Sequence, residues 1–423
     1  MSDLISRDGY LSELEKHQGK TGLIKAVTGV RRCGKSTLLQ LFQKKLLRRK
    51  IPASRIISIS LESVENEYLR DGKVLYKHVK KAIKTGDTHY VCIDEIQLAD
   101  GYEEAVNSLR LLKNADIYVT GSNSTIFSGK FATRWAGRYI EIKMLPLSFK
   151  EYASVFPKVN PDILYKNYVE QSSFPEALVY YDKLKNTNAF GAGGWDESGV
   201  RMYLDAIYNS IMIKDVMLHH GVKEAALLER VVKCLFSNIG SETSINAMVN
   251  MLNNDLKLHP KEKKVYAATL EHYIDGLLKS FVFYKAERGY IKGREYLKAN
   301  AKYYAVDVAL RYYLLGSKGL DSGHILENIV YLELLRRGYK VYVGKVGEKE
   351  IDFVAEGADG TEYYQVAQTV RGRETLNREL APLNAISDHN PKFLLTRDYE
   401  PKTAYNGIRQ LNVLEWLLGI TLS

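Results

Sequence analysis

The chain has 423 residues and a mass of 48.1 kDa, which exceeds one ordinary domain and predicts about two to four. Hydrophobic residues make up 45% and charged residues 26%, a composition that excludes a wholly disordered chain. The net charge of +10 and the pI near 9.1 favour a nucleic-acid partner, but only weakly.

The chain lacks the features of an exported or membrane-bound protein. No apolar run approaches the roughly 20 residues that span a bilayer, and no secretory signal precedes the first predicted element. Its three cysteines are far apart, which predicts neither a disulfide framework nor a zinc site. We therefore expect a cytoplasmic protein with no membrane partner.

Short apolar runs alternate with amphipathic helical patterns over the first 145 residues. The first helix after a strand is predicted at residues 37–50. Strands are predicted at residues 22–28, 55–61, 88–94, 116–120 and 139–145. Strands separated by helices predict an α/β fold class, with a parallel sheet covered on both faces.

Helical patterns dominate after residue 146, and the chain returns to an α/β pattern near its end. Helices are predicted at residues 148–155, 161–181, 200–219, 223–236, 244–253 and 265–279. Strands at 281–286 and 295–299 follow the last three helices, which is the outline of a winged helix. The remaining elements are helices at 325–337 and 373–387 and strands at 340–343, 350–355, 362–367 and 392–396.

The sequence GVRRCGKST at residues 29–37 fits the phosphate-binding pattern G-x-x-x-x-G-K-[ST] between a predicted strand and helix. Its glycines permit a tight turn whose N–H groups point at phosphate oxygens, and the helix adds its positive end. We expect Lys35 to reach the β- and γ-phosphates and Ser36 to ligate Mg²⁺. The predicted nucleotide-binding residues here are Gly29, Val30, Arg31, Arg32, Cys33, Gly34, Lys35, Ser36 and Thr37.

Two further strands are predicted to end in polar residues that complete this site. Asp94 and Glu95 follow a buried strand, whose carboxyl end faces ligands in open α/β sheets. Asp94 is expected to hold Mg²⁺, and Glu95 to act as the general base for the attacking water. Ser122 and Asn123 end the next strand and are candidates for contact with the γ-phosphate or the water.

An arginine beyond the third polar strand is a candidate for stabilising the transferred phosphate. Arg134 and Arg138 lie in this segment, and we assign the role to Arg138, acting in cis or on a neighbour's nucleotide. A structural arginine paired with a carboxylate is the alternative.

The order of GVRRCGKST, YVCIDEIQ, VTGSNS and AGRYIEIKMLPLSFKEY resembles AAA-superfamily ATPases of the bacterial and archaeal "ATP-binding protein" family. The resemblance covers nearly the whole chain, and SSFPE at residues 172–176 is similar to the family's Gly-Gly-Phe-Pro-Glu. It implies ATP as the nucleotide and a C-terminal domain of unknown function numbered 4143. It also makes oligomerisation plausible, because AAA-type sites often use a neighbour's arginine.

The last hundred residues resemble the PD-(D/E)xK nuclease superfamily, through the order helix, three strands, helix, strand. Such enzymes need carboxylates for Mg²⁺ and a lysine for the scissile phosphate. Glu327, Asp352 and Gln365 match the metal-holding positions, but Ala367 stands at the lysine position. We expect a degenerate site that holds a partner rather than cleaving DNA. A lysine that has moved, such as Lys345 or Lys349, and purely structural carboxylates remain alternatives.

These patterns predict four domains: a P-loop AAA-type ATPase core at 1–147, a helical lid or linker at 148–220, a winged-helix-like domain at 221–315 and a nuclease-like domain at 316–423. The predicted function is Mg²⁺-dependent ATP binding and hydrolysis that switches nucleic-acid or protein binding. Basic residues of the predicted hairpin form a plausible phosphate-contacting surface, but winged helices also bind proteins, so both partners stay open; these residues are Lys285, Arg288, Lys292, Arg294 and Lys298. The alternatives are a nucleotide-gated scaffold with negligible hydrolysis and an ATP-regulated DNA nuclease.

Overall fold

The computed structural model describes residues 5–84, 86–124, 135, 137–181, 194–255, 264–291, 296–316, 322–399 and 404–420. The chain divides into two compact units. The first comprises Met1–Pro146 with Lys279–Phe281, and the second comprises Leu147–Leu278 with Val282–Ser423. The predicted end of the ATPase core, at residue 147, lies beside this division.

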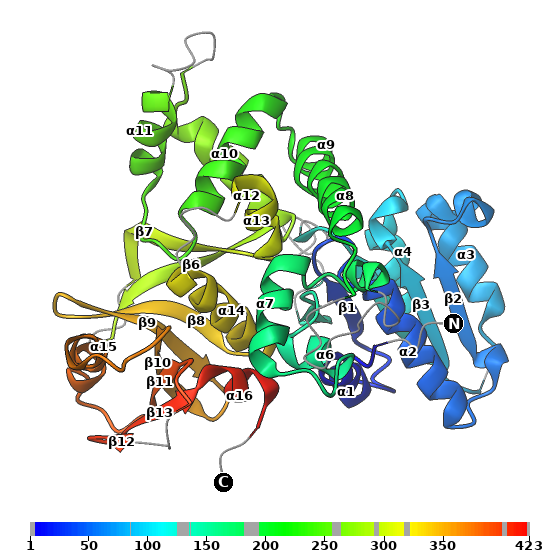
Figure 1. Cartoon of the computed structure of the whole chain (residues 1–423). Helices are drawn as coiled ribbons and strands as arrows, with labels where there is room; N and C mark the ends of the chain where they lie inside the picture. The colour runs from blue at the N-terminus through cyan, green and yellow to red at the C-terminus, as the bar shows by residue number, and fades with distance from the viewer. Residues whose placement is uncertain are drawn as a thin grey trace. The chain divides into compact units, whose positions relative to one another are not determined.

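The first unit is built on a parallel sheet in the order β2-β3-β4-β1-β5 (Figure 1). Its strands are β1 (Ile24–Thr28), β2 (Ile56–Ser60), β3 (His89–Asp94), β4 (Ala115–Gly121) and β5 (Tyr139–Lys143). Its helices are α1 (Asp8–Lys16), α2 (Lys35–Arg48), α3 (Gly72–Ala82) and α4 (Tyr102–Arg110). Short 3₁₀ helices span Ala53–Arg55, Val64–Arg70 and Ile96–Leu98. The predicted α/β fold with a P-loop-type parallel sheet is confirmed.

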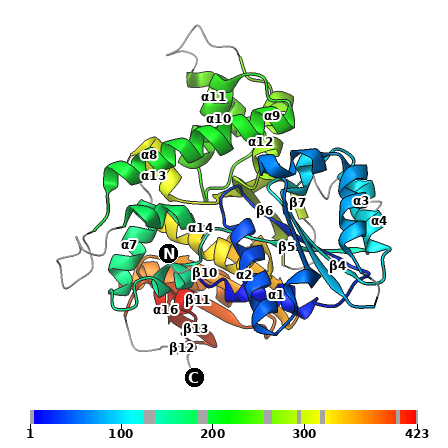
Figure 2. The same cartoon turned by 90° about the vertical axis from the view of Figure 1, so that its right-hand side faces the viewer.

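Helices cover both faces of this sheet, α1 and α2 on one face and α3 and α4 on the other (Figure 2). Successive side chains of a strand point to opposite faces, and β4 shows the division. Ile117 and Val119 join the core with α3 and α4, whereas Tyr118 packs on Phe42 of α2 with ring centroids 4.5 Å apart. Near-continuous burial along β1, β3 and β4 therefore reflects two covered faces.

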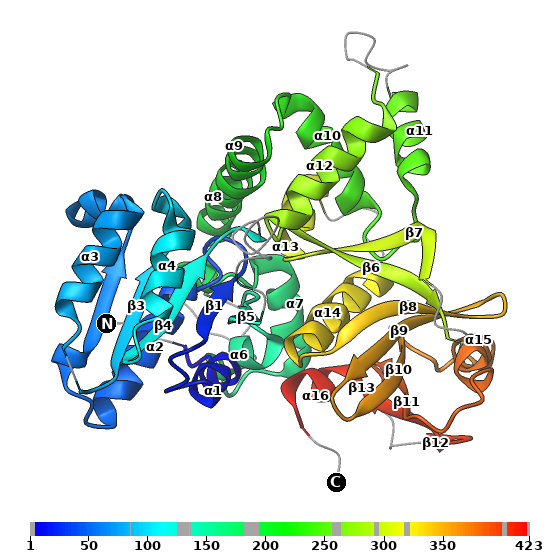
Figure 3. The same ribbon diagram turned by 180° about the vertical axis from the view of Figure 1, so that it is seen from behind.

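The second unit contains a mixed sheet in the order β12-β13-β11-β10-β9-β8-β6-β7, which can be followed from β7 to β12 in Figure 3. Its strands are β6 (Phe283–Tyr290), β7 (Tyr296–Ala305), β8 (Lys340–Val346), β9 (Lys349–Gly357), β10 (Gly360–Ala367), β11 (Lys392–Thr396), β12 (Ala404–Tyr405) and β13 (Ile408–Asn412). The pairs β6–β8, β10–β11 and β11–β13 are parallel, and the remaining pairs are antiparallel.

The helices of the second unit come mostly before its sheet in the sequence. They are α6 (Phe149–Ser154), α7 (Pro161–Gln171), α8 (Glu197–Ile207), α9 (Val216–His220), α10 (Ala225–Ser237), α11 (Ile245–Asp255), α12 (Ala267–Lys279), α13 (Ala309–Leu315), α14 (Ser322–Arg336), α15 (Arg373–Asn384) and α16 (Val413–Leu418). A 3₁₀ helix spans Pro175–Tyr180, and a π-helix at Tyr208–Asp215 joins α8 to α9. Within the described ranges, no helix has both the length and the apolar character that a membrane span requires.

The predicted hairpin of the winged-helix-like segment is present as β6 and β7, but it belongs to a larger sheet. Residues Arg288–Tyr290 of β6 pair with Val343–Lys345 of β8. Residue 243, between α10 and α11, forms a bridge with Ala301 of β7. The element order fits the expectation, yet the predicted boundary between residues 315 and 316 falls within one sheet. A separate winged-helix domain is therefore not confirmed.

The predicted helical lid, residues 148–220, also contacts the end of the chain. Helices α6 and α7 pack against α16. Asp162 on α7 accepts a hydrogen bond from Arg397 at 2.6 Å and one from Tyr399 at 2.9 Å. The Arg397 guanidinium lies 4.7 Å from the ring centre of Tyr165. These contacts place the start and the end of the second unit in one packed body.

Candidate nucleotide site and carboxylate cluster

The carboxyl ends of three strands meet at one edge of the first unit's sheet. β4 lies between β1 and β3, and Thr28 at the end of β1 is paired with Gly121 of β4. Ile93 pairs with Val119, which brings Asp94 beside Thr120. Because alternate residues share a face, Asp94 and Thr120 lie on the side that α2 covers. The phosphate-binding loop runs from this edge into α2.

Glycine is required at two positions of the loop. Gly29 has φ of 152°, and a Cβ there would lie 2.1 Å from the carbonyl oxygen of Met144. Gly34 has φ of 103° and caps the N-terminus of α2. Both backbone conformations strongly favour a residue without a side chain. The predicted loop therefore has the local geometry that its glycines were expected to permit.

The remaining loop residues fall into inward-facing and outward-facing groups. Val30 and Cys33 are buried, and burial raises the pKa of the Cys33 thiol. Arg31 and Arg32 are exposed, with Arg31 lying 3.3 Å from Glu62. Thr37 is half-buried in the first turn of α2. The outward-facing arginines therefore carry positive charge on the solvent side of the loop.

Lys35 is buried among acceptors at the start of α2. Its ammonium donates to the carbonyl oxygens of Gly29 and Val30, both at 3.2 Å. It also lies 3.5 Å from a carboxylate oxygen of Glu95. An ammonium in this position is surrounded by oxygens, and phosphate oxygens can replace these partners when a nucleotide binds.

Glu95 is held by several donors that favour its charged form. Burial opposes ionisation, but Lys35, Gln97 and Ser122 together hold the pKa of Glu95 below its ordinary value. The Ser122 hydroxyl donates to Glu95 at 3.0 Å. Glu95 has φ of 52°, a left-handed conformation that is uncommon for a residue with a side chain. The result is an ionised carboxylate fixed in one orientation.

Asp94 lies against the first turn of α2, as the metal prediction requires. Its carboxylate accepts hydrogen bonds from Thr120, at 2.5 Å, and from Ser36. Burial raises the pKa of Asp94, while these two bonds act against the rise. A hydroxyl and a carboxylate oxygen side by side are the hard oxygen donors that suit Mg²⁺. The residues present therefore fit the predicted metal.

Two residues at this edge escaped the sequence analysis. The Gln97 amide donates to Ser122 at 3.1 Å and also contacts Glu95. Thr120 donates to Asp94 and accepts from the backbone N–H of Glu95 at 2.9 Å. Gln97 lies two residues after Glu95, and Thr120 lies two residues before Ser122. This proximity in sequence to predicted site residues could have identified both. Asn123 is buried at the same strand end.

Arg7 is a third residue that the sequence did not reveal. Its buried guanidinium donates to the Cys33 carbonyl of the loop at 3.0 Å. It also donates to Leu145 at 2.6 Å and to Pro146 at 3.3 Å. Arg7 therefore ties the buried part of the loop at Cys33 to the segment that leaves β5.

Arg138 does not lie with these residues. It immediately precedes β5, whose first residue, Tyr139, pairs with Ile24 at the start of β1. A five-residue strand is about 16 Å long, so Arg138 is about that distance from the loop, at the opposite edge of the sheet. The strand direction thus places Arg138 at the amino end of β5, away from the loop of its own chain. A contact with a neighbour's nucleotide stays a prediction, and Arg134 lies outside the described residues.

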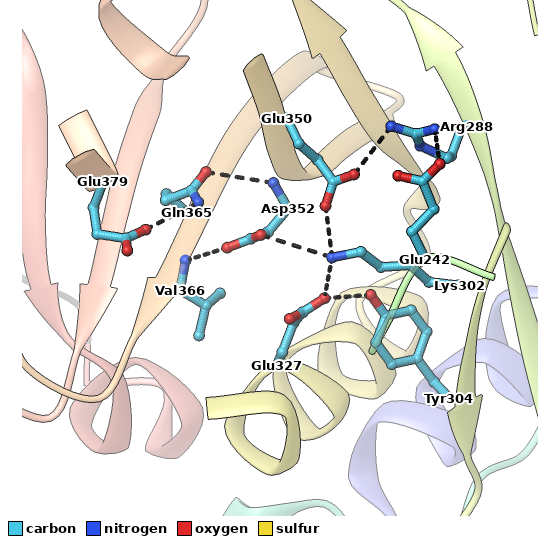
Figure 4. Close-up of polar contacts among 10 residues, drawn as sticks. All are labelled: Glu242, Arg288, Lys302, Tyr304, Glu327, Glu350, Asp352, Gln365, Val366 and Glu379. Carbon is cyan, nitrogen blue, oxygen red and sulfur yellow. Dashed lines mark hydrogen bonds and ion pairs between the residues drawn. The ribbon is translucent and has the colours of Figure 1, made fainter. Parts of the chain in front are cut away.

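A second cluster surrounds Lys302 of β7 in the second unit (Figure 4). The Lys302 ammonium lies 2.9 Å from Glu327 on α14, 2.9 Å from Glu350 on β9 and 4.0 Å from Asp352 on β9. The predicted residues Glu327 and Asp352 thus share one cation. Lys302 lies on β7, within the predicted winged-helix-like domain, whereas Glu327 and Asp352 lie within the predicted nuclease-like domain.

Gln365, the third predicted residue of the nuclease-like site, is turned toward other partners. Its amide oxygen accepts from the backbone N–H of Asp352 at 3.4 Å, and its amide nitrogen donates to Glu379 at 3.0 Å. The two lysines considered as replacements also lie elsewhere. Lys345 pairs with Glu348 at 3.5 Å, and Lys349 donates to a carbonyl of α15 at 3.4 Å.

Arg288 was expected on a basic surface of the hairpin. It is instead buried, paired with Glu242 and, at 3.2 Å, with Glu350. Lys285 on the same strand is half-exposed and lies 3.8 Å from Glu287. Lys292 and Arg294 lie outside the described residues, as does the side chain of Lys298. Arg288 is therefore not available to contact a nucleic-acid backbone.

Two known families match the chain, and the boundary between their matches lies close to the boundary between the two units. The family described as "AAA domain" matches residues 21–153, and a domain of unknown function, DUF8612, matches residues 164–321. The second family is not the domain numbered 4143 that the resemblance implied, and its match ends before the nuclease-like region. Those two parts of the resemblance are not confirmed.

Similar proteins come from bacteria and archaea. An uncharacterised protein of Methanocaldococcus jannaschii is 27% identical over 354 residues, covering 79% of this chain and 72% of the relative. The solved structure of the Aeropyrum pernix ORC2 protein in ADPNP-ADP complexes has a TM-score of 0.45 and 11% identity, covering 79% of this chain and 96% of that one.

An uncharacterised protein of Haemophilus influenzae is 36% identical over 420 residues, covering 98% of this chain and 99% of the relative. Similarity at this level over both whole chains establishes common membership of a family. The chain therefore belongs to the family of this H. influenzae protein, and residues 21–153, most of which lie in its first unit, match the AAA domain family.

Proposed function

We propose that the first unit binds MgATP at the edge formed by β1, β4 and β3 and hydrolyses it. One observation carries the proposal: Lys35 and Glu95 lie 3.5 Å apart, beside the hydrogen-bonded pair of Ser36 and Asp94. Four residues from two separated motifs therefore converge on one place. Convergence of a phosphate-binding lysine, metal-holding oxygens and a base is what phosphoryl transfer to water needs.

Each residue has a role that follows from its neighbours. Lys35 would exchange the loop carbonyls for β- and γ-phosphate oxygens and offset their charge. Ser36 and Asp94 would hold Mg²⁺, which supplies further positive charge to the phosphates. Glu95, kept ionised, would accept a proton from the water that attacks the γ-phosphorus. Ser122 and Gln97 would keep the Glu95 carboxylate in place during this transfer.

Two substitutions separate nucleotide binding from hydrolysis. Lys35→Ala is expected to abolish the thermal stabilisation that MgATP gives the parent. Glu95→Gln is expected to keep that stabilisation and to lower kcat by about 100-fold or more, because a general base contributes that much. Lys44→Ala, an exposed lysine on the same helix, is the matched control and should behave like the parent.

The results that contradict the proposal are equally specific. Stabilisation of Lys35→Ala by MgATP equal to that of the parent would show that the nucleotide binds elsewhere. Equal, slow hydrolysis by the parent and Glu95→Gln would favour the alternative of a nucleotide-gated scaffold.

We further propose that nucleotide occupancy controls the binding of a macromolecular partner by the second unit. The positive net charge of the chain supports DNA, whereas the burial of Arg288 removes one of the expected DNA contacts. Steady-state hydrolysis with and without duplex and single-stranded DNA distinguishes a DNA partner from a protein partner. Stimulation by DNA supports a nucleic-acid switch, and hydrolysis unaffected by DNA supports a protein partner.

A further inference from the structure

The carboxylate cluster of the second unit does not fit the metal that its nuclease-like order implies. A metal-holding carboxylate needs an oxygen open to a cation at about 2.1 Å for Mg²⁺. The oxygens that face one another here instead face an ammonium, which lies 2.9 Å from both Glu327 and Glu350. Among the residues that the structure describes, no group of three or more His, Cys, Asp and Glu side chains is arranged to hold a metal ion.

Further protein donors contact the three carboxylates (Figure 4). The Tyr304 hydroxyl donates at 2.6 Å to the same Glu327 oxygen that faces Lys302, and the backbone N–H of Val366 donates to the second oxygen of Asp352 at 2.8 Å. Arg288 reaches the second oxygen of Glu350 at 3.2 Å. A bound metal would have to compete with these donors as well as with Lys302. The hydrogen bonds therefore orient the carboxylates toward the lysine.

We propose that the Lys302 ammonium takes the place of a divalent cation in this cluster and fastens the β6–β7 hairpin to α14 and β9. The lysine comes from β7, whereas Glu327 lies on α14 and Glu350 and Asp352 lie on β9. Arg288 of β6 extends the same set of ion pairs to Glu242. The cluster is thus an internal cross-link, and it carries no nuclease activity.

The charge state of Lys302 agrees with a permanent cation. Burial alone would lower the pKa of Lys302, but Glu327, Asp352 and Glu350 raise it above its ordinary value. The three carboxylates therefore favour the charged form of Lys302. Burial and the nearby Glu327 raise the pKa of Asp352, and Lys302 and the Val366 N–H oppose that rise.

The competing interpretation makes Lys302 the displaced catalytic lysine of an active nuclease. In that case a metal would bind Asp352 while the ammonium remained free for a phosphate. The distances disfavour it, because two carboxylates already lie 2.9 Å from Lys302, which has an exposed side-chain fraction of only 6%. The two interpretations predict opposite results for metal binding by the parent protein.

The test is a titration of the nucleotide-free full-length protein with Mn²⁺, counting bound ions by electron paramagnetic resonance of the free ion. We expect the parent and Asp352→Asn to bind the same number of ions. Lys302→Met should bind one more ion than the parent, and Lys302→Met with Asp352→Asn should lose it. Lys285→Met, which changes a half-exposed lysine on β6, is the control and should match the parent.

Stability provides a second readout of the same substitution. Lys302→Met should melt at a lower temperature than the parent in EDTA, and Mn²⁺ should raise its melting temperature by more than it raises that of the parent. An ion bound by the parent and lost in Asp352→Asn would overturn the proposal, as would Mn²⁺-dependent DNA cleavage lost in that variant. A folded Lys302→Met that gains no ion would also overturn it. If Lys302→Met does not fold, the comparison of the parent with Asp352→Asn decides alone.

Discussion

Lys25 and Asp116 form a buried ion pair at the amino edge of the first unit's sheet, far from the candidate nucleotide site. Both side chains have an exposed fraction of 0%, and they are in direct contact. Lys25 also donates to the carbonyls of Lys20 and Leu23, at 3.1 and 2.9 Å. Replacing Lys25 by methionine would leave the Asp116 carboxylate buried without its cation.

Removing one partner of a buried pair costs about 3–5 kcal/mol. The entropy of unfolding is about 2.1 cal/mol/K per residue, so a first unit that ends at Pro146 has a total near 0.3 kcal/mol/K. The melting temperature of this unit should therefore fall by about 10–16 °C. Asp116 would keep two neutral donors, the Tyr118 hydroxyl at 2.9 Å and the Gly19 N–H at 2.8 Å. These two hydrogen bonds do not replace the positive charge of Lys25.

Differential scanning calorimetry with and without MgATP identifies the transition of the first unit, since the proposed site lies there. Lys25→Met should lower that transition by about 10–16 °C. Lys45→Met removes an ammonium that lies 2.7 Å from Glu15 but is 41% exposed, and it should shift the transition little. Adding Asp116→Asn to Lys25→Met should restore part of the loss. A Lys25→Met protein that melts within about 2 °C of Lys45→Met would refute the reasoning.

Three further predictions follow from other contacts. Arg7→Met should raise the Kd for ATP about tenfold, because the loop loses a charged donor worth roughly 1.5–3 kcal/mol. The Kd of Arg7→Lys should lie between those of the parent and Arg7→Met. A Kd of Arg7→Met equal to that of the parent would contradict this role. The folded protein lowers the pKa of Glu95 below its unfolded value of about 4.3, so ionised Glu95 contributes stability above that pH. The difference in stability between the parent and Glu95→Gln should therefore be constant at higher pH and shrink as the pH falls through the lowered folded pKa. Melting temperatures of both proteins measured across this pH range check the prediction. Asp307→Ala should lower the melting temperature of the second unit, since Ser172 and Ser173 donate to that buried carboxylate at 2.8 and 2.6 Å; an unchanged transition in calorimetry would count against it.

The candidate nucleotide site was readable from the sequence because its chemistry lies in short contiguous segments. The loop of residues 29–37 and the pair Asp94–Glu95 each follow a strand, and parallel strands end at a common edge. The strand bounds in the first unit also came close, since β3 was expected at 88–94 and spans His89–Asp94. Near-continuous apolar runs make such strands easy to recognise.

What the sequence did not reveal depends on contacts between distant segments. Lys302 meets Glu327 and Glu350 because β6 pairs with β8, and no local pattern specifies that pairing. Arg288 was expected on a phosphate-contacting surface of the hairpin, yet it is buried, and the buried Lys302 was not among the basic residues that the sequence singled out. Charge alone does not tell an exposed lysine from one that neutralises buried carboxylates.

Two buried lysines illustrate how neighbours decide what a cation can do. Lys35 has two carbonyl partners at 3.2 Å and one carboxylate at 3.5 Å, and it lies at the start of a helix beside a glycine loop. Phosphate oxygens are stronger acceptors than carbonyls, so a nucleotide can take these places and leave Glu95 to its hydroxyl and amide donors. Lys302 has two carboxylates at 2.9 Å and a third at 4.0 Å, so an incoming anion would be repelled and an incoming cation must displace a charge already matched. The first arrangement suits exchange of partners during turnover, and the second suits permanence.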